Sequence, residues 1–186
     1  MHLKPALTIV FIALVASVQA QNRASDFQLS KIERDLILPP DYAYTGAEKL
    51  REAHDRWLKV EAVFAAVPEF TDEVTFKYYI LIGGKLLTGE VTHVNVLAGR
   101  ELFSSMYVPP HVLTHLLGNR PPNTNSVENI AVQVLLKGEL KDEISLVRAR
   151  PQWFASLPAL SGFVLNKNET PFASLFWGRY EQIKGR

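Results

Sequence analysis

The sequence contains no cysteine and has no surplus of either charge. Without cysteine it has no disulfide framework, no thiolate metal site, no cysteine nucleophile and no lipid-modified cysteine anchor. Its 20 basic and 19 acidic residues leave a formal net charge of +1, which provides no electrostatic basis for binding nucleic acid. The hydrophobic content of 47% excludes general disorder. These absences leave a globular protein as the starting hypothesis.

The first 20 residues predict a cleaved export signal. Lys4 supplies positive charge, residues 6–18 are uncharged and mostly apolar, and the small residues Val18 and Ala20 flank Gln19. This apolar run of about 13 residues is shorter than the roughly 20 that span a bilayer, and charge interrupts every later apolar run. We therefore expect no membrane span after cleavage. Export without cysteine favours a bacterial protein that is periplasmic, outer membrane associated or extracellular.

The remaining chain predicts one domain preceded by an extension. Its length of about 166 residues suits a single domain. Residues 21–56 form the extension, which is loose at its start, has a candidate edge strand at residues 31–38, and has either a short helix or an irregular connection at residues 45–56. Residues 57–186 form the β-domain.

Alternating apolar and polar residues predict short strands through the β-domain. The pattern covers residues 57–64, 74–82, 86–96, 101–108, 130–136, 144–149 and 162–165. Gly83 and Gly84 predict a tight hairpin, and Gly118 ends a helical turn over residues 111–117. Residues 172–183 fit a strand or a helical turn. This order predicts a mainly β fold, an antiparallel sandwich or open barrel, with one or two short helices.

His111 and His115 are the best-spaced candidates for metal ligands. On a helix they would share a face, but Val112 occupies the place of the glutamate that accompanies such a pair in metalloproteases. A third ligand would have to come from His93, His54 or a carboxylate. The alternative is two surface histidines beside a loop, and we expect no metal or other cofactor.

No other catalytic constellation is visible in the sequence. The pairs Asp72–Glu73 and Asp142–Glu143 are adjacent on strands, where neighbouring side chains point to opposite faces. Ser104 and Ser105 lack the glycine-flanked turn of a nucleophilic serine, and Lys85 lacks a phosphate-binding loop. We therefore predict that the protein is not an enzyme.

Aromatic residues are the remaining candidates for binding. Tyr42 and Tyr44 lie in a proline-flanked segment, where they could instead cover an edge strand. Tyr79 is predicted to point away from the core, and Trp153 lies in a loop. A platform of such side chains would bind sugar or peptide, but aromatic residues in a sandwich usually fill its core.

Five strings in the chain are distinctive: residues 72–81 (DEVTFKYYIL), 87–96 (LTGEVTHVNV), 104–108 (SSMYV), 170–173 (TPFA) and 179–181 (RYE). Together they resemble a small family of secreted bacterial proteins with an immunoglobulin-like β-sandwich, encoded near genes for type IV pilus-like machinery. The resemblance covers residues 57–183 and implies that fold and setting, but no catalytic residue. We predict a non-enzymatic interaction module that binds an envelope protein, plausibly a pilus or secretion component. The alternatives are a carbohydrate-binding module or a metal-dependent hydrolase, and the oligomeric state stays open.

Overall fold

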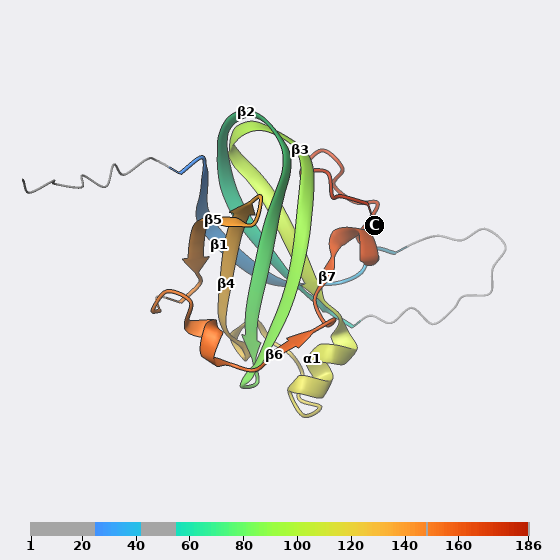
Figure 1. Ribbon diagram of the computed structural model, residues 1–186. Coiled ribbons are helices and arrows are strands. Elements are labelled where there is room, and N and C mark those ends of the chain that lie inside the picture. Colours follow the sequence, from blue (N-terminus) through green and yellow to red (C-terminus); the bar gives the residue numbers. More distant parts are fainter. Residues whose placement is uncertain (1–24, 42–54, 148, 186) are drawn as a thin grey trace, which may run out of the picture.

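A computed structural model describes residues 25–41, 55–147 and 149–185, and it is mainly β (Figure 1). The predicted signal peptide, Tyr42, Tyr44 and nearly all of the segment at residues 45–56 lie outside these residues. Within the described ranges, no helix is long and apolar enough to cross a membrane.

The described chain consists of strands with a few short helices between them. The strands are β1 (Phe27–Ile37), β2 (Trp57–Ile82), β3 (Lys85–Val108), β4 (Val127–Leu136), β5 (Glu139–Ser145), β6 (Ala159–Ser161) and β7 (Leu165–Asn166). The α-helix is α1 (Pro110–Leu116), and the 3₁₀ helices are η1 (Thr124–Ser126), η2 (Trp153–Ser156) and η3 (Lys167–Glu169).

The long hairpin of β2 and β3 organises the fold. Gly83 and Gly84 form its turn with φ angles of +56° and +70°, as predicted. Both strands turn over at their middles (Figure 1), where the register of the β2–β3 pair shifts. The two halves of β2 then face each other, because the rings of Phe64 and Phe76 lie 4.7 Å apart. One continuous sheet thus supplies both layers of the sandwich.

The other strands extend the two layers. β1 pairs with the first half of β2, whereas β4 pairs with its second half and β5 pairs with β4. Side chains join β1 to β5: the Leu29 N–H donates to Asp142 Oδ2 at 2.7 Å, and Ser25 Oγ donates to the Lys141 carbonyl at 2.9 Å. The predicted β-sandwich is confirmed, with one correction. The sheet is mixed, because β6 runs parallel to β3.

Side chains that alternate along the strands fill the space between the layers. Val74, Phe76 and Tyr78 on β2 and Val132 and Val134 on β4 are buried, as the alternation predicts. The core also contains Phe27, Leu29 and Ile32 of β1, which begins earlier than we predicted. We predicted a strand that starts at residue 31, but the apolar side chains at positions 27 and 29 are buried against β2 and extend the strand toward the N-terminus.

Several predicted boundaries are wrong. The sequence predicts separate strands at residues 57–64 and 74–82, and at residues 86–96 and 101–108. Each of these pairs is one strand with a bend, β2 and β3, because strand pairing continues on both sides of the bend. β5 begins directly after a turn at Lys137 and Gly138, so pairing starts before residue 144. Residues 171–180 are mostly turns. The helical turn ending at Gly118 is confirmed as α1, and the φ of Gly118 is +61°.

Candidate functional site

Strand register builds a polar surface on the outer face of β1, β2 and β3. Glu33, Glu61 and Ser105 align across the three strands in one row. Lys31 aligns with Val63 in one neighbouring row, and Asp35 with Lys59 in the other. Like charges placed opposite each other destabilise a strand pair, so Glu33 and Glu61 each need a cation nearby.

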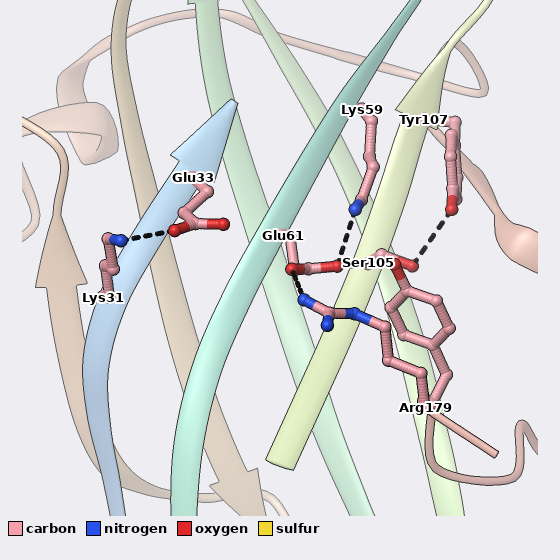
Figure 2. A network of polar contacts seen from close by, with 8 residues as sticks. Lys31, Glu33, Lys59, Glu61, Ser105, Tyr107 and Arg179 are labelled. Atoms are coloured by element: carbon pink, nitrogen blue, oxygen red, sulfur yellow. Dashed lines mark hydrogen bonds and ion pairs between the residues drawn. The ribbon is translucent and has the colours of Figure 1, made fainter. Parts of the chain in front are cut away.

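Glu61 is buried, and three side chains bind its carboxylate. Lys59 Nζ lies 2.7 Å from Oε2 and Arg179 Nη2 lies 2.7 Å from Oε1. The Tyr180 hydroxyl donates to Oε2. Figure 2 shows Arg179 reaching Glu61 from the C-terminal segment, while Lys31 pairs with Glu33 on β1. Both oxygens of Glu61 are therefore engaged.

Burial and pairing act in opposite directions on these groups. Burial alone would raise the pKa of Glu61, but the bonds from Arg179, Lys59 and Tyr180 outweigh it, so the pKa lies below its usual value. Burial, with a smaller contribution from Glu61, raises the pKa of the Tyr180 phenol. Burial also raises the pKa of Tyr107 to about 12. The site holds one carboxylate ionised and its tyrosines neutral at pH 7.

Aromatic contacts hold the C-terminal segment over this surface. The guanidinium of Arg179 lies 3.9 Å from the ring centroid of Phe103 on β3. The ring of Phe172 stacks on Tyr107 at 5.1 Å and meets Trp57 edge-on at 5.9 Å. The outer face of β1–β3 is thus partly covered and does not face solvent throughout.

Lys167 stabilises the turns at residues 171–180 that follow it in the chain. Its ammonium donates to the Ala173 carbonyl at 2.8 Å and lies 5.7 Å from the ring centroids of both Trp177 and Tyr180. Burial lowers its pKa. Above this brace, Trp177 is 79% exposed and Phe176 is 65% exposed. Phe176 has a φ of +57°, a left-handed conformation that is costly for a residue with a β-carbon.

The C-terminal segment also covers a second buried polar residue, His93. His93 is buried, with Nε2 2.9 Å from Ser104 Oγ and Nδ1 3.1 Å from the Glu181 carbonyl. Burial lowers the pKa of His93 to about 4. The neighbouring chain pairs with β3, since Ile183 forms a bridge with His93. Ser104 and His93 are both buried, so neither side chain of this pair reaches the protein surface.

Two hollows border the C-terminal segment. The smaller, of about 460 Å³, lies over β1–β3, with Lys31, Arg100, Phe103 and Arg179 among its lining residues. The larger, of about 670 Å³, lies over the β2–β3 hairpin between residues 161–169 and 183–185. Its lining is rich in polar groups, including Thr88, Thr92, Ser161 and Asn166. Both are open surface hollows and not enclosed pockets.

The structure brings two of the predicted binding residues together, but not as a free platform. Tyr79 lies on the face of β2 opposite Tyr78, as predicted, but it is partly covered: its ring stacks on Phe154 at 3.6 Å, and its hydroxyl donates to Gln133 Oε1. Trp153 meets Phe154 edge-on at 5.7 Å, and its indole N–H donates to Ser145 at 3.0 Å. These aromatic side chains pack into a small outer cluster, so they offer little free surface.

The histidine pair lies away from this site. His111 and His115 are exposed on α1, whereas His93 is in the core and joins neither of them. In the described part of the chain, no three histidine, aspartate or glutamate side chains gather to hold a metal ion.

Sequence reasoning missed Glu61, Arg179 and the exposed Phe176–Trp177 pair. Glu61 looked like one more polar residue on a solvent face. The string Arg179-Tyr180-Glu181 carries part of the resemblance to a family, but nothing in it indicates a contact with Glu61. A lone acid between Lys59 and Val63 was the available signal, and it is a weak one.

Comparisons with known proteins agree with the β architecture. A family model matches residues 18–186. The chain belongs to that family. The match is wider than the resemblance at residues 57–183 and includes the whole N-terminal extension at residues 21–56. A comparison with curated proteins found no match.

A crystal structure of a protein from Akkermansia muciniphila shares the fold. Its TM-score is 0.73 at 22% identity, and the match covers 86% of this chain and 93% of that chain. At this identity the likeness concerns the fold alone.

Proposed function

We propose that this chain is an exported, non-enzymatic envelope protein of a bacterium that acts as a protein-interaction module. We further propose that it serves a type IV pilus-like or secretion apparatus and has the immunoglobulin-like type of sandwich. The export signal at residues 1–20 and the five resembling strings support this setting. Family membership over residues 18–186 supports a whole-domain role.

The exposed pair Phe176 and Trp177 is the observation that carries the proposal. Large aromatic side chains concentrate binding energy in protein interfaces, and here they stand in solvent on a braced turn. Lys167 holds that turn from below. The left-handed backbone at Phe176 is a conformation that a chain keeps only where the surroundings impose it. A preorganised aromatic surface of this kind suits docking to another protein.

The polar groups nearby support a role without catalysis. Both oxygens of Glu61 accept bonds from Lys59, Arg179 and Tyr180, so the carboxylate is poorly placed to take a proton from a substrate. Ser104 is buried beneath the C-terminal segment.

Photo-crosslinking in the native cell tests the proposal. The photoreactive residue p-benzoylphenylalanine replaces Trp177 in one strain and His115, exposed on α1, in a matched control. We expect position 177, but not position 115, to crosslink to an envelope protein that mass spectrometry identifies as a pilus or secretion component. Equal crosslinking at both positions, or turnover of a substrate by the purified protein, would refute the proposal.

A carbohydrate-binding module is the second candidate. The polar lining of the larger hollow and the exposed indole of Trp177 favour it. Because Trp57 and Trp153 are partly buried, a bound sugar should change mainly the fluorescence of Trp177. No change in fluorescence across a broad panel of oligosaccharides would remove this candidate.

A further inference from the structure

Apolar side chains are exposed where β2 and β3 bend. Phe70 and Leu97 are cross-strand partners and are 52% and 60% exposed, and Val67 beside them is 70% exposed. We call these three residues the tip. They lie beside the register shifts of the β2–β3 pair, and the two strands turn over at their middles (Figure 1). Clustered aliphatic and aromatic side chains in solvent mark interaction surfaces more often than scattered ones do.

The tip is part of a fixed structure. The Val67 N–H donates to the Asp26 carbonyl at 2.9 Å, which ties the bend of β2 to the start of β1. On β3, a β-carbon at Gly99 would lie 2.7 Å from Leu102 Cδ2, so the backbone is packed closely there. Val96, next to Leu97, is fully buried and anchors the bend in the core. The exposed side chains therefore stand on backbone that is hydrogen-bonded to β1 and anchored in the core.

Acidic residues surround the tip. Asp26, Glu69 and Asp72 are exposed, and none of them forms an ion pair within the described residues. The strand segments at residues 66–73 and 94–101 contain four acids and one basic residue, Arg100. One of these acids, Glu73, pairs with Lys184 at 2.6 Å, so Glu69 and Asp72 of β2 and Asp26 beside β1 carry the local negative charge. Because the chain as a whole is nearly neutral, this is a local concentration of negative charge.

We propose that the tip is a second docking surface, which takes a basic protein segment carrying apolar side chains. The tip would form the apolar centre of the interface, and the acids would form a polar rim that attracts lysine and arginine. A lipid surface is a poor occupant, because bacterial membranes carry anionic headgroups that the acidic rim repels. This proposal does not depend on the Phe176–Trp177 surface.

The test crosslinks from the tip in the native cell and maps the partner. With p-benzoylphenylalanine at position 70, we expect a crosslinked peptide with net positive charge and apolar residues. The double variant Glu69→Lys/Asp72→Lys should lower the yield about tenfold, because it replaces attraction with repulsion. Both substituted side chains are exposed, so circular dichroism and Tm of the purified variant should match the wild type. Crosslinking from position 177 should not change.

The other outcomes overturn the proposal. A crosslink to lipid, to a second copy of this chain or to its own residues 1–24 would identify a different occupant. A neutral or acidic peptide, or an unchanged yield in the double variant, would remove the electrostatic argument. A crosslink from position 177 without one from position 70 would refute this inference alone, whereas loss of both would also refute the proposed function.

Discussion

Acid should destabilise this protein through His93. The imidazole is buried beneath the C-terminal segment, between Ser104 Oγ and the Glu181 carbonyl. Burial lowers its pKa to about 4, whereas an unfolded chain has the ordinary value of about 6.5. Between these pH values the unfolded state binds a proton that the folded state excludes. The free energy of unfolding therefore falls as the pH drops from 6.5 toward 4.

The size of the effect follows from the difference in pKa. One pKa unit corresponds to about 1.4 kcal/mol, so the shift of His93 corresponds to a loss of about 3 kcal/mol on going from pH 7 to pH 4. That is a large part of the 5–15 kcal/mol that typically stabilises a domain.

Urea unfolding of the wild type and His93→Gln at pH 7, 6, 5 and 4 measures this loss. Glutamine does not titrate, so the stability difference between the two proteins should change by about 3 kcal/mol across the series, in favour of the variant at low pH. Burial also raises the pKa of Glu181. Glu181 titrates in both proteins, so its contribution cancels from the difference in stability. His115→Gln, an exposed position on α1, controls for replacing a histidine. A difference that stays constant from pH 7 to pH 4 would refute the reasoning.

Three further predictions concern packing and pairing. Phe76→Ala should lower the free energy of unfolding, measured in urea, by about 3–5 kcal/mol, because Phe76 is fully buried. Tyr79→Ala should lower it by less, about 1–3 kcal/mol, since this variant loses mainly the stacking of Tyr79 on Phe154 in η2. Equal losses in the two variants would contradict this ranking. Arg179→Gln should cost about 1 kcal/mol, given that the side chain is partly exposed, and NMR titration should show a raised pKa for Glu61; an unchanged pKa would mean that the ion pair is absent in solution. Gly89→Ala should cost about 1–3 kcal/mol, because its β-carbon would come within 2.7 Å of a neighbouring side chain; an unchanged Tm would contradict the packing.

Most of the fold was accessible from local patterns. The alternation from Val74 to Ile82 and the glycine pair after it predicted the central hairpin, because side chains of period two must lie on one face of a strand. The helical turn ending at Gly118 was equally local. The bends within β2 and β3 were mistaken for breaks, since a local pattern does not show that pairing resumes beyond an irregularity.

The candidate binding surfaces were harder to predict from the sequence than the fold. The pattern along β2 gives the face on which Tyr79 lies. It does not show what covers that face, and Phe154, far along the chain, covers the ring of Tyr79. The tip was missed because Phe70 and Leu97 become neighbours only when β2 and β3 pair.

The sequence by itself predicted most of the strands and the face on which their core residues lie, because these depend on residues close together in the chain; the export signal at residues 1–20 stays a prediction from the same kind of local pattern. Only the tertiary structure decided that Glu61 is buried and that Phe176 and Trp177 are exposed. Arg179 follows Glu61 by 118 residues, and their meeting depends on how the whole sheet folds over and where the C-terminal segment crosses it. Whether a side chain is buried depends on which other segment packs over it. The alternation of residues along one strand gives the face of each side chain but does not show what covers that face.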